Sequence, residues 1–457
     1  MADKIVEIGE TDAFVVATQW KMRRAGQGPH LSCSLLELAG MPNLACLRSG
    51  LDEALRRHPM IVARVARPWP WTRPWYVKAR DAVALVPMVC WRLPGTSTAA
   101  LAEPMREIAS ERALVDFLLN EAAEEMENPG FCNIRMDVLA CPDGRCVCIM
   151  TWSHLVLDGV GAEWLLKEIA ALADDPNAES VACSFVTPAK SPHRTLYDRW
   201  QATWPMMEHL NGVIAAGIHS LAGRNPRASR LHHDWVHLDA EKSAQITTRA
   251  AKICGPLIQT HFFLACAIQA HDAVWRRFRG GQAPCYTMAL PIQQRVRGKP
   301  AAIFRNNVSV MFFSAQAAEM ADQDALTTVL LRQQQQAMKQ KLMASFSEMQ
   351  RWMTLLPTPI YSAFLDLQMK GENTAFHHSN TGSFASGLSE FGGATITNAW
   401  HVPGLFSPPG TGLFVSERGS CLTVSVSWRA AAVTADEAHY LRDAFLAAML
   451  GAPMPTD

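Results

Sequence analysis

The sequence has no excess charge of either sign, and this absence excludes one class of function. Its 457 residues include 42 Lys and Arg and 42 Asp and Glu, so the formal net charge is zero. A protein that binds nucleic acid needs a basic surface to displace the counterions of the phosphates. We therefore expect no nucleic acid among its partners.

The sequence also lacks the segments that direct a chain into or across a membrane. It holds no uninterrupted apolar run of the roughly 18 residues that a transmembrane helix requires. Its N-terminal stretch, MADKIVEIGETD, is acidic and has no apolar region of the kind found in secretory signals. The 12 cysteines follow no zinc-site spacing, Cys141, Cys146 and Cys148 included, and are expected to be reduced thiols. These features indicate a cytoplasmic protein without a metal site.

What the sequence has in quantity is apolar side chains. Hydrophobic residues make up 49% of the chain and charged residues 18%, which predicts a large buried core. The 14 Trp and 21 Met residues leave two interpretations open, because they either fill this core or line a pocket for a variable apolar ligand. With about 100–200 residues per domain, the length predicts two domains.

Hydrophobic periodicity and turn residues predict two halves of similar content. In the first half we expect a helix over 43–58, a half-buried strand over 131–140, a second strand over 145–153, and a helix over 160–173. The segment over 68–77 is expected to be an aromatic hairpin whose prolines exclude a central strand, and the alternative is that its tryptophans contact a membrane surface or an acyl chain. In the second half we expect a helix over 257–277, strands over 286–292 and 306–314, one long helix over 324–356, a hairpin over 413–428 and a helix over 434–449.

A stretch rich in Pro, Ser and charge over 174–194 predicts a linker between the halves. The helix expected after it, over about 196–222, either lies on lipid through Trp200 and Trp204 or packs between the domains. We therefore divide the chain into an N-terminal half over 1–180, a linker and crossover helix over 181–234, and a C-terminal half over 235–457.

His154, Asp158 and Gly159 form an HxxxDG motif between a strand and a helix. A histidine at the end of a buried strand, in a loop held by an Asp-Gly turn, is well placed to act as a base. Gly159 permits a sharp backbone turn, and Asp158 either pairs with an arginine or caps the following helix. The interpretation without chemistry is a structural histidine.

With this motif the chain resembles the superfamily of CoA-dependent acyltransferases and non-ribosomal-peptide condensation domains, which share the chloramphenicol-acetyltransferase-like fold. Five further segments are similar to passages of that superfamily, namely LDEALRRHPMIVARV over 51–65, LPIQQR over 290–295, NNVSVMF over 306–312, SNTGSF over 379–384, and SEFGG over 389–393. Two features depart from its patterns. Ser153 stands where many members have a first histidine, and Glu390-Phe391-Gly392-Gly393 replaces the DFGWG box.

The resemblance implies an α+β fold of two chloramphenicol-acetyltransferase-like halves, each a sheet flanked by helices, arranged as a V with a central tunnel. His154 would lie in the tunnel and take the proton of an acceptor hydroxyl or amine as the acceptor attacks a thioester, with no covalent acyl-enzyme. Asp158 would point away from His154 and hold the loop through an arginine of the second half. Arg295 is the candidate partner, with Arg297 as the alternative.

The resemblance also implies supporting roles. Donors for the oxyanion would come from the backbone near Gly159 or from Ser379 and Asn380. The residues expected to line the tunnel are Ser153, Asn306 and Asn307, with turn residues as the alternative for the two asparagines.

Two further segments are interpreted beside the motif. His377-His378 is expected in a polar loop away from the site. The basic stretch over 295–299 either meets a CoA phosphate or a carrier protein, or is a solvated loop.

Three functions follow for comparison. The first is a stand-alone acyltransferase with acyl-CoA as donor and a small-molecule hydroxyl or amine acceptor. The second is a free-standing condensation or offloading enzyme whose donor is bound to the phosphopantetheine of a carrier protein and arrives in trans. The third is a non-catalytic interaction module of the same fold. We expect a monomer with no permanently bound cofactor, and a peripheral contact with a membrane as a further feature.

Overall fold

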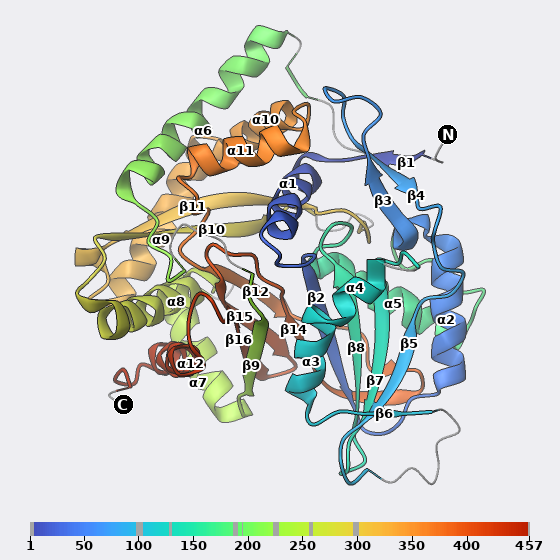
Figure 1. Ribbon diagram of the computed structural model, residues 1–457. Coiled ribbons are helices and arrows are strands. Elements are labelled where there is room, and N and C mark those ends of the chain that lie inside the picture. Colours follow the sequence, from blue (N-terminus) through green and yellow to red (C-terminus); the bar gives the residue numbers. More distant parts are fainter. Residues whose placement is uncertain are drawn as a thin grey trace.

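The chain folds into mixed helix and sheet, in line with the α+β prediction. The computed structural model describes residues 4–96, 104–127, 130–185, 191–193, 195–222, 228–255, 259–295 and 301–455. Figure 1 shows two main sheets, one among the blue and cyan elements and one among the green and red elements. The V-shaped arrangement of the halves stays a prediction.

The larger sheet has seven strands in the order β13-β14-β2-β8-β7-β5-β6. These strands are β2 (Leu31–Leu38), β5 (Met88–Arg92), β6 (Arg106–Glu107), β7 (Ile134–Ala140), β8 (Cys146–Ser153), β13 (Glu390–Phe391) and β14 (Ala394–Val402). Strand β2 pairs antiparallel with β8 on one side and with β14 on the other. The sheet of the N-terminal half therefore includes strands from far along the C-terminal half (Figure 1).

Helices cover both faces of this sheet. On one face lie α2 (Leu44–Arg57) and α5 (Gly159–Asp174), and on the other lie α3 (Glu111–Asn120) and α4 (Ala122–Glu127). The prediction of a half-buried strand over 131–140 is wrong, because every residue of β7 is buried. The polar residues Arg135 and Asp137 of β7 pair with each other on the face of the sheet that α3 and α4 cover. There Arg135 Nε donates to Asp137 Oδ2 over 2.8 Å.

The second sheet has the order β12-β15-β16-β9. Its strands are β9 (Leu231–His237), β12 (His377–Ser383), β15 (Thr411–Arg418) and β16 (Cys421–Arg429). The helices α7 (Ala240–Cys254), α8 (Thr260–Trp275) and α12 (Ala435–Leu450) form a core with this sheet. The hairpin over 413–428 is confirmed by β15 and β16. The polar loop expected for His377 and His378 is wrong, because both residues begin β12.

A two-stranded ribbon of β10 (Cys285–Gln293) and β11 (Val308–Gln316) extends toward α1 (Glu10–Arg24), where Thr11 Oγ1 donates to the Val308 carbonyl over 2.6 Å (Figure 1). Around the ribbon pack α6 (Leu196–Ala216), α9 (Gln323–Lys339), α10 (Leu342–Met353) and α11 (Thr358–Gln368). Short helical turns lie at Pro59–Val62, Arg276–Gly280 and Ala317–Glu319.

The prediction of a single helix over 324–356 is wrong, because the helix is interrupted between α9 and α10. Lys341 has φ of 54°, which no continuous right-handed helix contains. The break turns α10 against α6, where the Met206 N–H donates to Ser345 Oγ over 3.0 Å. The long run of Gln and Lys around the break favours helix locally, so the periodicity alone did not locate it.

A small sheet tests the interpretation of the aromatic segment. Strands β1 (Lys4–Glu7), β3 (Ala63–Ala66) and β4 (Trp75–Lys78) pair in the order β1-β4-β3. The hairpin over 68–77 is confirmed, because β3 and β4 pair antiparallel. The exclusion of a central strand is wrong, because the last proline, Pro74, lies just before β4 and removes no hydrogen-bond donor from it.

Several expectations concern the surface. Trp200 and Trp204 on α6 are half exposed, whereas Met206 of the same helix is buried against the second core. In the described part of the chain, no helix combines the length and the apolar character that crossing a bilayer requires. All 12 cysteines are free thiols.

Candidate active site

The HxxxDG loop connects β8 to α5 and is held by backbone hydrogen bonds. The His154 N–H donates to the His30 carbonyl over 2.9 Å, just before β2. The Leu155 carbonyl accepts from the Tyr76 hydroxyl over 2.7 Å. The Arg305 N–H donates to the Val156 carbonyl over 2.6 Å, so a segment of the second half also fixes the loop.

Asp158 uses both of its carboxylate oxygens. Oδ1 accepts from the Gly161 N–H over 2.7 Å and caps the N-terminus of α5. Oδ2 accepts from Arg295 Nη1 and from the Asn307 N–H, each over 2.8 Å. The helix cap and the ion pair, which the sequence offered as alternatives, are therefore both present. Arg297 lies outside the described residues.

The glycine that the loop requires is Gly161 rather than Gly159. Gly159 has no positive φ, and a Cβ on it would meet its nearest neighbour, His401 Nε2, at an ordinary 3.7 Å. The expectation that Gly159 provides a sharp turn is therefore wrong. A Cβ on Gly161 would lie 2.1 Å from the Ile303 carbonyl oxygen, so this position has no room for a side chain.

The ring of His154 lies among other rings. It stacks on His30 with a centroid distance of 4.6 Å and an interplanar angle of 16°, and Trp152 lies 5.4 Å away on a tilted plane. Burial lowers the pKa of His154 below its ordinary value of 6.5, and the negative charge of Asp158 partly opposes this shift. Most of the imidazole is therefore neutral at neutral pH and able to accept a proton.

Asn306 links His154 to the N-terminal helix. Its Nδ2 donates to the His154 carbonyl over 2.9 Å and to Asp12 Oδ1 over 3.0 Å. Asp12 is fully buried in α1, and its Oδ2 accepts from Arg305 Nε over 2.9 Å. Sequence reasoning missed Asp12, because an acidic residue in the first turn of a helix is common without any function.

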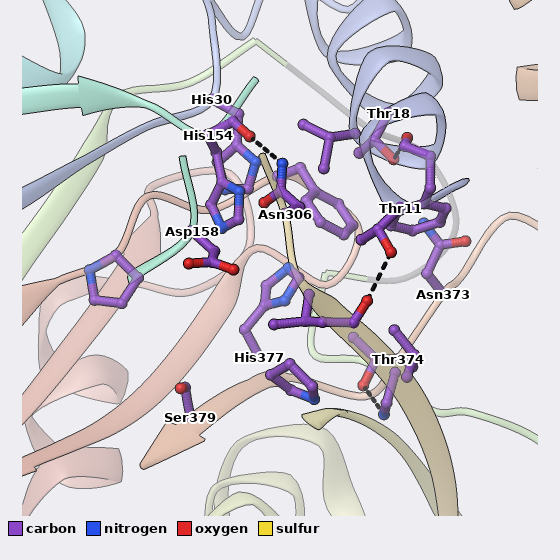
Figure 2. A pocket seen from close by; sticks show the side chains of 18 of the residues that line it. Thr11, Thr18, His30, His154, Asp158, Asn306, Asn373, Thr374, His377 and Ser379 are labelled. Atoms are coloured by element: carbon purple, nitrogen blue, oxygen red, sulfur yellow. Dashed lines mark hydrogen bonds between the residues drawn. The ribbon is translucent and has the colours of Figure 1, made fainter. Parts of the chain in front are cut away.

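A cavity of about 500 Å³ opens beside His154 (Figure 2). Of the predicted site residues it includes His154, Asp158, Gly159, Asn306, Ser379 and Asn380. It does not include Ser153, Asn307 or Arg295, which support the loop from behind. Its wall away from His154 is mainly apolar and includes Phe14, Val310, Phe312, Phe346, Met349 and Leu365.

Four further histidines line the cavity, and the sequence placed none of them there. These are His30, His377, His378 and His401. Burial lowers the pKa of His377 and of His401 to about 3, and lowers the pKa of His30 well below its ordinary value. They come from three separate segments, so no local motif joins them. In the described part of the chain, no three His, Cys, Asp or Glu side chains converge as metal ligands.

No family model and no curated protein matches the sequence. The structure, however, is similar to trichothecene 15-O-acetyltransferase from Fusarium sporotrichioides, with a TM-score of 0.67 and 12% identity over 97% of this chain and 95% of that one. The first condensation domain of the calcium-dependent antibiotic synthetase follows with a TM-score of 0.65 and 12% identity, over 97% and 95% of the two chains. The starter condensation domain of rhizomide synthetase, solved with C8-CoA and Leu-SNAC, has a TM-score of 0.60 and 13% identity, over 98% and 94%.

The chain has the chloramphenicol-acetyltransferase-like fold. This is the fold of the acyltransferase and condensation-domain superfamily that the HxxxDG segment and its companions resemble. Identities of this size show the fold alone, so the chemistry has to be argued from the cavity and its residues.

Proposed function

We propose that the protein is a stand-alone acyltransferase that moves an acyl group from acyl-CoA to a hydroxyl or amine acceptor, with His154 as general base. One observation carries this proposal. The half-buried, mostly neutral imidazole of His154 lines a largely apolar cavity at the end of a loop that Asp158 holds in place. A positioned base of this kind contributes about 10²–10⁴-fold to a proton-transfer step.

The proposed reaction needs no covalent enzyme intermediate. His154 takes the proton of the acceptor as its oxygen or nitrogen forms a bond to the thioester carbonyl carbon. The tetrahedral intermediate then collapses, the carbon–sulfur bond breaks, and the thiolate recovers the proton from His154. Donors for the oxyanion come from Ser379 or Asn380 of β12 or from the backbone near Gly159, all of which line the cavity.

Asp158, Arg295, Asn306 and Asn307 act as positioning residues in this proposal. The Asp158 carboxylate bonds to α5 and to the second half, so its role is to hold the loop rather than to relay a proton. Asn306 holds the His154 carbonyl from the other side. The catalytic loop is thereby fixed by both halves of the chain.

The apolar wall of the cavity supports an apolar acyl group or acceptor. A cavity of about 500 Å³ within one chain supports a monomer as the working unit. The second candidate, a condensation or offloading enzyme with a carrier-bound donor, is supported by the similarity to condensation domains over nearly the whole chain. Both candidates use the same His154 chemistry and differ in the donor, and neither needs a permanently bound cofactor.

The donor is tested first by thermal shift with free CoA, acetyl-CoA and a long-chain acyl-CoA. A ligand at 100 times its Kd stabilises the native state by about 2.7 kcal/mol, which raises the Tm by a few degrees. We expect the long-chain thioester to produce the largest shift. No shift with any CoA thioester, together with one on adding an acylated carrier protein, would replace the first candidate by the second.

Catalysis is tested by thiol release from the thioester that binds, in the presence of a panel of alcohols and amines. His154→Gln keeps a polar side chain of similar length but has no basic nitrogen, so we expect it to lose at least 10²-fold in turnover. Two outcomes would overturn the proposed enzymatic function and favour a non-catalytic interaction module. One is equal thiol release by the wild type and His154→Gln, and the other is no thiol release from either type of donor.

A further inference from the structure

The orientation of the His154 ring is fixed in an unusual way. A catalytic imidazole is ordinarily oriented by a hydrogen bond to its second nitrogen, from a carboxylate or a carbonyl. Among the described residues, no other residue hydrogen-bonds to His154 Nδ1, and the backbone acceptor that acts on the ring is the carbonyl of His154 itself. The Asp158 carboxylate is engaged by Gly161, Arg295 and Asn307 instead.

We propose that His30 is the positioning residue of the general base, holding the His154 ring by stacking on its face. The proposal rests on the acyltransferase function above. It assigns to His30 two effects on the reaction: it sets the direction of the His154 ring, and it keeps water away from one face of that ring.

The stacking geometry supports the first effect. The two rings lie nearly parallel, at 16°, with centroids 4.6 Å apart (Figure 2). The backbone joins the same two residues, because the His154 N–H donates to the His30 carbonyl. His154 is thus held to His30 through both its main chain and its ring.

His30 is itself fixed by the second half of the chain. Its Nε2 lies 3.2 Å from the Gly404 carbonyl oxygen, which only accepts hydrogen bonds, so Nε2 carries the proton. Gly404 lies close against the start of β2, because a Cβ on it would lie 1.8 Å from the Leu31 carbonyl oxygen. Phe406 contacts the His30 ring edge-on, at 6.0 Å.

The charges around the pair explain why the two histidines have different roles. Asp158 and Asp12 favour the charged form of His154, whereas His154, His377 and Arg429 disfavour a charge on His30. When His154 takes the proton of the acceptor, His30 therefore stays neutral. A neutral ring stacked on an imidazolium stabilises the cation through its π face and adds no positive charge to the site.

The test compares two substitutions of His30 with different consequences for the stack. His30→Ala removes the ring and admits water beside His154, so we expect the pKa of His154 to rise toward 6.5 and kcat to fall ~10²-fold, the cost of a misplaced catalytic group. His30→Phe keeps a ring on the same face but loses the bond to Gly404. We expect it to retain the low pKa of His154 and most of the kcat.

The pKa of His154 is measured by NMR titration of the histidine ring protons, with His154→Gln used for assignment. This readout does not depend on turnover, so the proposal about His30 can fail while the acyltransferase function stands, and the reverse. His233→Ala is the matched control, because burial also lowers the pKa of His233, which does not line the cavity. We expect it to lower stability without moving the pKa of His154.

Two results would overturn the proposal. One is a His154 pKa and kcat in His30→Ala equal to those of the wild type. The other is a His30→Phe protein whose His154 pKa rises as far as that of His30→Ala, which would show that the stacked ring has no part in the effect. If His30→Ala does not fold, the comparison of His30→Phe with His30→Asn decides, because Asn supplies a polar group without a stacking ring.

Discussion

Arg295 Nη1 lies 2.8 Å from Asp158 Oδ2, although 137 positions separate the two residues in the sequence. Both side chains are largely buried, and Arg295 donates further hydrogen bonds to the Ala302 carbonyl over 3.1 and 2.9 Å. The pair joins the HxxxDG loop of the first half to the end of β10 in the second. It therefore couples the position of His154 to the packing of the two halves.

Removing one member of this pair is expected to cost more than removing both. Arg295→Gln leaves the Asp158 carboxylate buried without its cation, which typically costs about 3–5 kcal/mol of stability. Asp158→Asn together with Arg295→Gln removes both charges and keeps an oxygen for the helix cap. We expect denaturant unfolding to show the double variant as more stable than Arg295→Gln alone.

Asp158→Ala removes the cap and the ion pair together, so we expect it to lower both the Tm and the turnover. If loop order, Tm and turnover all stay at the wild-type level, the positioning role of Asp158 is wrong.

The pH dependence of activity follows from the pKa of His154. Burial lowers this pKa below 6.5, and a general base works in its neutral form. The acid limb of kcat/KM is therefore expected to have an apparent pKa below 6.5, with full activity on the alkaline side of it. An acid limb above 6.5 would contradict a base whose pKa is lowered by its partly buried position. The measurement is a pH–rate profile at subsaturating donor.

The free energy of unfolding should also decrease at acidic pH, for a different reason. His377 and His401 have pKa values of about 3 in the folded protein, against 6.5 in the unfolded chain. Below pH 6.5 the unfolded state binds more protons, so the stability present above pH 6.5 is lost as the pH falls toward 3. Each histidine contributes roughly 1.4 kcal/mol per pH unit to this loss.

Guanidinium unfolding at several pH values between 7 and 5 measures this slope. His401→Gln removes one of the histidines whose pKa is lowered in the folded protein, and we expect the slope to decrease by about one proton. The same slope in the wild type and in His401→Gln would show that His401 does not titrate in this way.

The exposed aromatic residues of α6 predict a contact with lipid. Trp200 and Trp204 are 50% and 51% exposed, and tryptophan favours the interface between water and membrane. We expect the protein to sediment with anionic vesicles and Trp200→Ser/Trp204→Ser to reduce that binding without lowering the Tm. Trp69→Ser is the matched control, because Trp69 is exposed on the β3–β4 hairpin instead. Equal binding by all three proteins would exclude α6 as the contact.

The sequence predicted most of the regular elements and the position of the HxxxDG loop, because these depend on local patterns. The apolar run over 145–153 located β8, and the HxxxDG spacing placed His154 and Asp158 at its end. The environment of β7 was not predictable, because its burial depends on α3 and α4 packing over Arg135 and Asp137 from elsewhere in the chain.

The histidines around the cavity show the same limit more sharply. His30 and His401 precede or end ordinary apolar strands, and nothing beside them in the sequence indicates a site. They reach His154 only because β2 pairs with β8 and β14 pairs with β2. Such a cluster is a product of strand order, which local periodicity does not encode.

The pairing of β14 with β2 also determines how this protein can be divided. A fragment that ends near residue 180 lacks β14, so the N–H and C=O groups along one edge of β2 lose their partners. Unpaired edges of this kind recruit strands from other molecules, so such a fragment is expected to aggregate when produced alone. Adding the remaining C-terminal piece during refolding would restore the missing strand, which makes the chain suited to fragment complementation and unsuited to study as isolated halves.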